Sequence, residues 1–375
     1  MLGIYIHIPF CLKKCSYCDF HSVTGDSIPQ KEYTNALLAE IDILSKEYHL
    51  TNQPVATIYF GGGTPTIFDA KFFSIILEKI NKKFSVAQNA EITVEANPET
   101  LTQKKIKEFS NICNRLSIGI QTFNDKHLQQ LGRIHSSDTA KSAIKDAQKA
   151  GFKNIGIDLM WGLPDQTIKE LEHDLSEAVL LQPQHISAYQ LTTDRLKNLP
   201  DDEISRKMWL LVHNKLTDAG YTHYEISNYN RTIAPSDQRT RCRHNENYWH
   251  YGEWLGLGSG ATSQLIQKTK DKKQKTKRFT VKKDVEKYLM HNFEYEFEDI
   301  NPKTAMAEYC FLGLRTSDGI NLDEFKSRFG VEFDSAYPKI REKWIADRLA
   351  EQTGGNFHLI IEGMLISDEL FQNFV

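Results

Sequence analysis

Six short apolar runs in the first half of the chain alternate with segments of helical periodicity. In the first helical segment, apolar residues recur three or four positions apart from Tyr33 to Leu44, the spacing of one helix face. Strand–helix alternation predicts βα units and a parallel sheet, and six right-handed units curl into a partial barrel. We therefore predict an α/β fold, a partial (β/α)6 barrel. Its predicted strands are 4–8, 57–60, 92–96, 116–121, 155–160 and 186–191.

Side chains in these strands alternate between an apolar face and a polar or small one. In the first strand three isoleucines share one face, whereas Tyr5 and His7 share the other. The polar faces of later strands carry Glu95, Gln121 and Asp158. A covered parallel sheet reads as continuous apolar runs, and a filled barrel holds Val, Ile and Leu inside. The pattern predicts an open, ligand-filled cavity, and the alternative is a sheet face exposed to solvent.

Three cysteines, Cys11, Cys15 and Cys18, follow the first strand, at the end where such barrels carry their chemistry. Three thiolates can hold three irons of a cubane cluster, which leaves the fourth iron without a protein ligand. A metal that binds substrate needs such an open position. The alternative is a zinc site with His7 or His21 as fourth ligand, although zinc sites more commonly show two separated ligand pairs.

Composition narrows the class of protein. The chain has 375 residues and a net charge of −3, so no global charge attracts it to nucleic acid. No apolar run approaches the ~20 residues of a transmembrane helix, and the N-terminus has no basic signal-peptide region. We expect a cytoplasmic protein without a transmembrane segment or nucleic-acid partner. Its remaining cysteines, Cys113, Cys242 and Cys310, are weaker signals, and Cys113 and Cys310 are expected to be buried thiols.

Five ordered motifs carry a resemblance to a known family. The spacing C-x3-C-x2-C behind "YIHIPF" resembles the radical S-adenosylmethionine (radical SAM) superfamily. With "YFGGGTPT", "RLSIGIQTF", "LGRIH" and "DLMWGLPDQT", the chain is similar to the oxygen-independent coproporphyrinogen III oxidase group. The resemblance implies a [4Fe-4S] cluster with Cys11, Cys15 and Cys18 as its metal ligands. It also implies S-adenosyl-L-methionine on the open iron.

The resemblance further implies which residues contact S-adenosylmethionine. Glu95 and Asp158 can accept hydrogen bonds from ribose hydroxyls or an ammonium group, and Arg133 can clamp a carboxylate. Taken alone, each residue is as readily a structural hydrogen-bonding group. The candidate cofactor-binding residues are Tyr5, Tyr17, Gly62, Gly63, Thr64, Glu95, Gln121, Arg133 and Asp158.

Two departures from the oxidases favour their sister group, the HemW-type proteins, which resemble the oxidases but are haem carriers. The oxidases have a further cysteine where this chain has Phe20, and an N-terminal arm for which the first strand leaves no room. The segment "HNENYW", in which His244 leads, is associated with haem in that group. His244 is therefore the candidate haem ligand. The alternative is that His244 to Trp249 form a hydrogen-bonded structural corner.

The pattern changes toward the C-terminus. We predict three parts: a barrel with the haem motif over 1–265, a basic hairpin and linker over 266–300, and a cap domain over 301–375. The last part reads as helices with a terminal ribbon, a winged-helix-like cap placed as a lid over the barrel mouth. It lacks a basic recognition helix. The lysine-rich stretch 268–278 could contact a membrane surface or a partner, but its composition favours a solvated loop.

Together these resemblances imply a haem chaperone. Its ligands are a [4Fe-4S] cluster, S-adenosyl-L-methionine and haem, and its partners a haem-acceptor protein and an electron donor for the cluster. The alternative is an oxidative decarboxylase of porphyrin biosynthesis, an activity against which Phe20 argues. A zinc-stabilised binding protein without redox chemistry is the third hypothesis.

Overall fold

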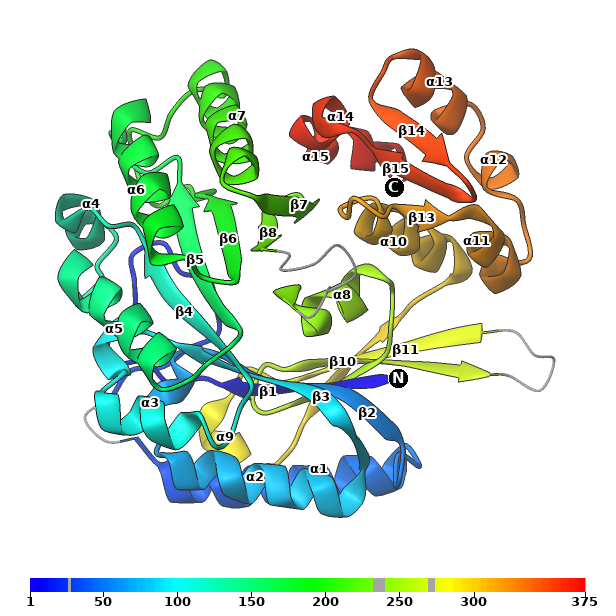
Figure 1. Ribbon diagram of the computed structural model, residues 1–375. Helices are drawn as coiled ribbons and strands as arrows, with labels where there is room; N and C mark the ends of the chain where they lie inside the picture. The colour runs from blue at the N-terminus through cyan, green and yellow to red at the C-terminus, as the bar shows by residue number, and fades with distance from the viewer. Residues whose placement is uncertain (26–27, 232–239, 269–273, 375) are drawn as a thin grey trace.

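The computed structural model describes residues 1–25, 28–231, 240–268 and 274–374 (Figure 1). Six parallel strands form the centre of the fold, as the apolar runs predicted, and most extend beyond the predicted bounds. They are β1 (Leu2–Ile8), β2 (Pro54–Gly62), β3 (Ser85–Ala96), β4 (Arg115–Gln121), β5 (Ile155–Trp161) and β6 (His185–Gln190).

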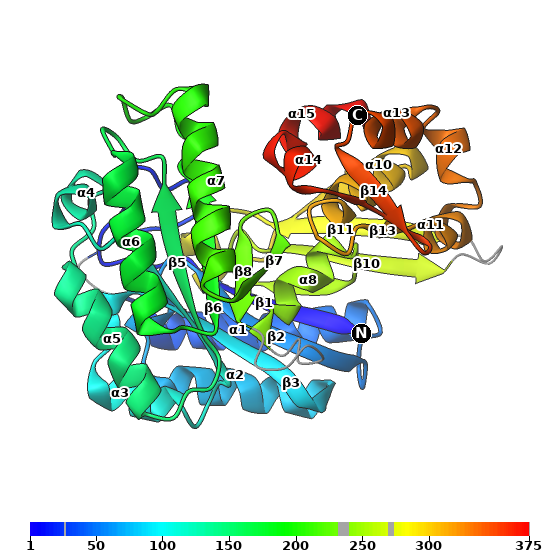
Figure 2. The same ribbon diagram turned by 45° about the horizontal axis from the view of Figure 1, so that its top comes forward.

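Six further strands widen the sheet at both sides. They are β7 (Tyr221–Glu225), β8 (Asn228–Arg231), β9 (Trp254–Leu257), β10 (Thr262–Lys268), β11 (Gln274–Val281) and β12 (Tyr295–Asp299). Among the described residues the order is β12-β11-β10-β9-β1-β2-β3-β4-β5-β6-β8-β7. The sheet curves into the partial barrel (Figures 1 and 2). Strands β10 to β12 continue this sheet, and residues 269–273 of the lysine-rich stretch lie outside the described part.

Helices cover the convex side of the central strands (Figure 1). Helix α2 shows why these helices form. The Asp69 carboxylate caps the first turn of α2 by accepting a hydrogen bond from Phe72 N–H (3.0 Å). The apolar stripe of α2 is buried against the sheet. The helices are α1 (Gln30–Glu47), α2 (Ala70–Lys83), α3 (Gln103–Phe109), α4 (Asp125–Gln130), α5 (Ser137–Lys149), α6 (Ile168–Leu181) and α7 (Asp202–Asp218). Short 3-10 turns follow β2 (Pro65–Ile67) and β3 (Pro98–Thr100).

The remaining elements lie after the barrel strands. Helix α8 (Arg243–Trp249) packs against the concave side, and α9 (Val285–Leu289) contacts α1. The C-terminal region has a small antiparallel sheet of order β13-β15-β14 surrounded by helices, which matches the predicted helices and ribbon. Its elements are α10 (Pro302–Gly313), β13 (Ile320–Asn321), α11 (Leu322–Phe329), α12 (Phe333–Ala336), α13 (Ile340–Ala346), β14 (Ala350–Thr353), β15 (Asn356–Leu359), α14 (Ile361–Leu365), α15 (Ser367–Phe371) and a 3-10 turn (Gln372–Phe374).

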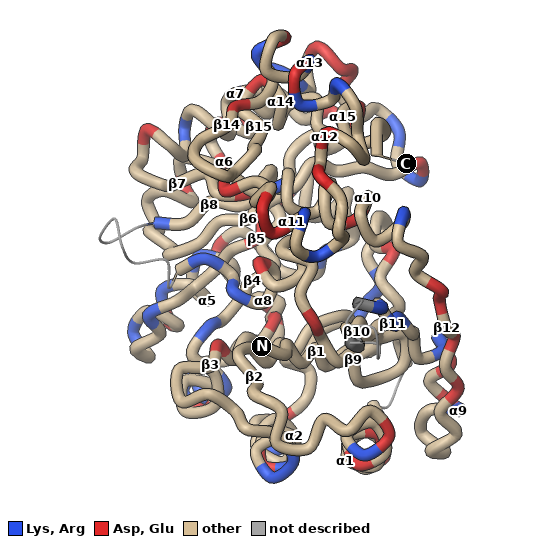
Figure 3. The backbone as a smooth tube through the Cα atoms, turned by 90° about the vertical axis from the view of Figure 1, so that its right-hand side faces the viewer, with Lys and Arg blue, Asp and Glu red and all other residues tan. Residues whose placement is uncertain are grey.

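The expected lid is wrong. No described residue of 301–374 lines the large cavity of the barrel, and Figures 1 and 2 show the C-terminal region beside α8, away from the cysteine loop. Figure 3 shows positive and negative residues interspersed along its helices. No helix in the described part of the chain is long and apolar enough to cross a bilayer.

A buried carboxyl joins α1 to the turn after β9. Glu40 Oε2 accepts hydrogen bonds from Gly258 N–H (2.8 Å) and from the Tyr288 hydroxyl (2.6 Å). Burial raises the pKa of Glu40 from 4.5 to about 7, and these hydrogen bonds oppose the rise only in part. The folded protein therefore keeps this carboxyl protonated over a pH range in which the unfolded chain has lost the proton.

This difference predicts a pH-dependent stability. As the pH rises from 4.5 to about 7, the Glu40 contribution to the free energy of unfolding declines, by about 3 kcal/mol in total. In Glu40→Gln that part of the decline is absent, which urea unfolding at pH 5 and pH 8 will measure. Glu32→Gln, an exposed position on the same helix, is the control. An unchanged difference between the two pH values in Glu40→Gln contradicts the prediction.

Candidate functional site

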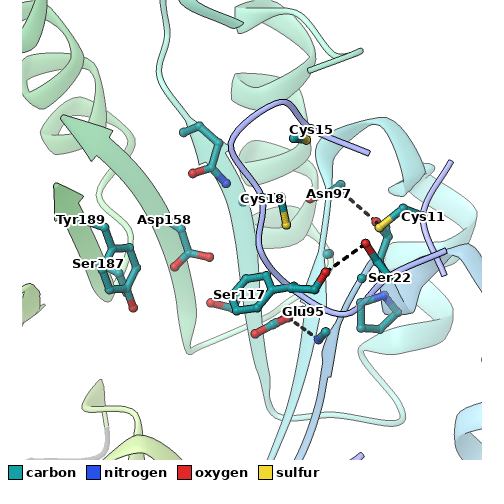
Figure 4. Close-up of a pocket in the computed structure, with 18 of the residues that line it drawn as sticks. Cys11, Cys15, Cys18, Ser22, Glu95, Asn97, Ser117, Asp158, Ser187 and Tyr189 are labelled. Atoms are coloured by element: carbon teal, nitrogen blue, oxygen red, sulfur yellow. Dashed lines mark hydrogen bonds between the residues drawn. The ribbon is translucent and has the colours of Figure 1, made fainter. Parts of the chain in front are cut away.

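A cavity of about 550 Å³ lies on the concave, polar side of the sheet (Figure 4). Its wall comes from β1 to β6, the cysteine loop and α8. The structure brings every residue that we assigned to metal, cofactor or haem binding to this one cavity. These residues are Tyr5, Cys11, Cys15, Tyr17, Cys18, Gly62, Gly63, Thr64, Glu95, Gln121, Arg133, Asp158 and His244.

Backbone hydrogen bonds fix the cysteine loop to the barrel. Val23 N–H donates to the Pro9 carbonyl (2.7 Å), and Cys11 N–H donates to the Val23 carbonyl (3.0 Å). Further along, Ser16 N–H donates to the Leu131 carbonyl (3.3 Å). The loop is thus held at both ends beside β1 and in its middle by the segment after α4.

Side chains from the barrel reach two of the three sulfurs. Thr64 Oγ1 donates to Cys11 Sγ (3.6 Å), and Arg133 Nη1 donates to Cys15 Sγ (3.7 Å). Burial raises the pKa of the Cys11 and Cys18 thiols. Metal ligation requires the thiolate. A metal that binds here must therefore displace the thiol protons that Cys11 and Cys18 retain in the metal-free fold.

The arrangement argues against the zinc alternative. Among the described residues, no group of three or more His, Cys, Asp or Glu side chains could hold a metal ion. Both candidate fourth ligands are engaged elsewhere, since His7 Nε2 hydrogen-bonds the His21 carbonyl (2.8 Å) and His21 Nε2 lies 3.1 Å from Ser259 Oγ.

Hydrogen bonds organise the cavity wall next to the cysteines. Asn97 Nδ2 donates to Thr64 Oγ1 (3.0 Å), and Arg133 Nη2 donates to Asn97 Oδ1 (2.8 Å) and to the Gly119 carbonyl (2.8 Å). A Cβ on Gly63 would lie 2.6 Å from the Phe10 carbonyl oxygen. Only glycine allows the cysteine loop to come this close to β2.

Two carboxyl groups face the middle of the cavity (Figure 4). The Tyr59 hydroxyl donates to Glu95 Oε1 (2.7 Å), and Gly62 N–H donates to Glu95 Oε2 (3.0 Å). Burial raises the pKa of Glu95 to about 7, and the nearby Asp158 charge contributes to the rise. Burial also raises the pKa of Asp158 to about 6, against the opposing effect of Arg115. Near neutral pH, both groups can therefore accept or donate hydrogen bonds to a ligand.

His244 lies at the floor of the cavity with both ring nitrogens engaged. Nδ1 is 2.8 Å from Thr57 Oγ1, and Nε2 is 2.8 Å from the Tyr248 hydroxyl. The residue is 1% exposed, and burial lowers its pKa to about 3. The residue therefore stays neutral, and its hydrogen bond to Tyr248 is one contact of the structural corner that was the alternative to haem ligation.

Sequence reasoning missed several wall residues. Asn97 follows β3, and Tyr59 and Tyr189 were not considered although they lie in predicted strands. Arg115 stood one position outside the predicted strand 116–121. The alternation on that strand, continued back from Ser117, would have placed Arg115 on the same polar face.

Comparison with known proteins identifies the family. The model of the radical SAM superfamily matches residues 5–178, and that of the HemN C-terminal domain matches residues 300–366. A protein of Haemophilus influenzae named heme chaperone HemW is 34% identical over 100% of this chain and 98% of its own length. This chain belongs to the HemW family. The HemW of Bacillus subtilis is 32% identical over 100% of this chain and 99% of its own, and that of Escherichia coli 39% over 70% of each.

A solved structure supports the fold of this HemW-family chain. Coproporphyrinogen III oxidase HemN of Escherichia coli, a radical SAM enzyme, superposes with a TM-score of 0.83 at 20% identity. The match covers 100% of this chain and 89% of the oxidase chain. At this identity the likeness shows the fold, an α/β radical SAM barrel with a helical C-terminal region.

Membership of the radical SAM superfamily implies a [4Fe-4S] cluster and S-adenosylmethionine. The donor set fits, because three free cysteines line one end of the cavity. Exchange of Cys11, Cys15 or Cys18 for serine is expected to reduce acid-labile sulfide to background after anaerobic reconstitution with iron and sulfide. Cys113→Ser, a buried cysteine outside the cavity, is the matched control and should retain the cluster. Sulfide retained in all three variants, or lost equally in the control, contradicts the assignment.

Proposed function

We propose that this protein binds haem and passes it to an acceptor protein, with a [4Fe-4S] cluster and S-adenosylmethionine at the cysteine end of the cavity. The observation that carries the proposal is the match over the whole chain to proteins named heme chaperone HemW. The proposal also includes a cytoplasmic location. It includes two partners, a haem-acceptor protein and an electron donor for the cluster. The boundaries at 265 and 300 stay predictions.

The cavity residues have separate roles in this proposal. Cys11, Cys15 and Cys18 hold three irons, and the bound cluster with S-adenosylmethionine supplies one-electron chemistry. Arg133, held by Asn97 and the Gly119 carbonyl, orients a carboxylate of the cofactor.

The other wall residues shape and position the cofactor's part of the cavity. Gly62, Gly63 and Thr64 let the cofactor lie against the β2 backbone. Glu95 and Asp158 position hydroxyl or ammonium groups. Tyr5, Tyr17 and Gln121 complete this part of the wall.

The test distinguishes transfer of haem to another protein from enzymatic conversion of coproporphyrinogen III. We expect the reconstituted protein to bind haem in a spectrophotometric titration and to release it to a haem-free globin. With S-adenosylmethionine, a reductant and coproporphyrinogen III under argon, we expect no protoporphyrinogen. Stoichiometric protoporphyrinogen formation would favour the oxidative decarboxylase and overturn the proposal, as would the absence of haem binding.

The role of His244 has its own test. Ligation of haem iron by Nε2 requires the Tyr248 hydroxyl to leave that nitrogen. If His244 is the ligand, Tyr248→Phe removes the competitor and tightens haem binding about fivefold, the value of one ordinary hydrogen bond. His244→Ala then weakens binding and shifts the haem absorption band. Unchanged affinity and spectra in both variants would show that His244 is only a structural corner.

A further inference from the structure

The cavity has a second charged end, far from the cysteines. Arg115 is the first residue of β4, and Gln121 is its last. At about 3.3 Å per residue, these positions are about 20 Å apart along the strand. Gln121 and Arg133 lie at the cysteine end, whereas Arg115 lines the cavity near α8 and His244.

Arg115 is a buried cation on the cavity wall. It is 2% exposed, and its Nε has no hydrogen-bond partner among the described residues. In the described part of the chain, no carboxylate forms an ion pair with it. A buried charge without a partner is costly, and folds retain such groups where something else compensates for the cost.

A glycine, Gly156, lies next to the Arg115 guanidinium. Gly156 of β5 pairs with Ser117 of β4, and a Cβ at this position would approach Arg115 Nη2 to 2.9 Å and His185 Nδ1 to 3.4 Å. His185 is 1% exposed and its Nδ1 also lacks a hydrogen-bond partner among the described residues. The glycine therefore leaves room for the Arg115 guanidinium beside the His185 ring, whose Nε2 hydrogen-bonds the Tyr224 hydroxyl (2.8 Å). Each of these two buried groups keeps one nitrogen without a hydrogen-bond partner among the described residues.

The charges around Arg115 do not satisfy its guanidinium. Glu91 is near enough to influence it, but its carboxylate accepts the N–H groups of Arg243 (3.2 Å) and His244 (3.1 Å) instead. Asp158 lies next to Ser187 and Ser117 (Figure 4). Both carboxyls therefore act on Arg115 at longer range, which leaves its planar set of donors open for a bidentate acceptor.

We propose that the inner end of the cavity is a carboxylate-binding subsite, in which the Arg115 guanidinium holds a carboxylate of the bound ligand. The inference rests on the proposed function, because haem carries two carboxylates at one edge of its ring. Anchoring that edge at Arg115 directs the rest of the macrocycle toward the middle of the cavity. The alternative is that Arg115 only balances the charge of Glu91 and Asp158 through buried water.

The test compares haem with its dimethyl ester, in which both carboxylates are neutral. Titrations use the full-length reconstituted protein under argon, with both porphyrins in the same dilute detergent. We expect wild type to bind the diacid about ten- to hundredfold more tightly than the ester, the range of a charge-assisted hydrogen bond. Arg115→Met should remove this preference by weakening only the diacid. Arg115→Lys should retain part of it.

The outcomes distinguish a failure of the Arg115 subsite from a failure of the proposed haem binding. Equal binding of diacid and ester by wild type overturns the subsite while the haem proposal stands, and this arm needs no variant to fold. Binding of neither form overturns both. Arg278→Met, which alters an arginine paired with Glu308 outside the cavity, is the control for general damage. If it loses the preference as Arg115→Met does, Arg115 is not the anchor.

Discussion

The fold depends on a parallel sheet with two unlike faces. Its convex face is apolar and covered by helices, but its concave face carries carboxyl, guanidinium, hydroxyl and imidazole groups. Such groups cannot be removed from water without partners except at a cost of several kcal/mol. The barrel therefore stays hollow, its wall groups pair with one another where they can, and the remaining ones face the space that a ligand would fill.

Different chemical groups line the cavity at successive positions along the strands. At the carboxyl ends of the strands, Thr64 and Arg133 contact the cysteine sulfurs and join the loop to the wall. In the middle, Glu95 and Asp158 have raised pKa values because they are buried. At the opposite end Arg115 provides a positive charge. The expected cofactor residues thus gather at one end of the cavity, and a buried cation lines the other.

The strand pattern predicted the barrel and the shared polar face of Tyr5, Glu95, Gln121 and Asp158, because alternation within a strand fixes which side chains share a face. The site residues in loops were identified by motif and resemblance. The strand pattern missed Arg115, since an arginine at the start of an apolar run reads as a boundary. His244 was identified by motif, but its two hydrogen bonds depend on Thr57 and Tyr248, contacts that tertiary packing alone creates. The lid was wrong because the helical pattern of 301–375 specifies its elements and not the surface on which they dock.

The central claim is that three cysteines leave one iron of a cluster open to S-adenosylmethionine. Electron paramagnetic resonance of the reduced, reconstituted protein tests it most directly, with S-adenosylmethionine labelled with oxygen-17 in its carboxylate. The account predicts a cluster signal that changes on addition of the cofactor and broadens with the labelled carboxylate. A cluster signal that is identical with and without S-adenosylmethionine would contradict it.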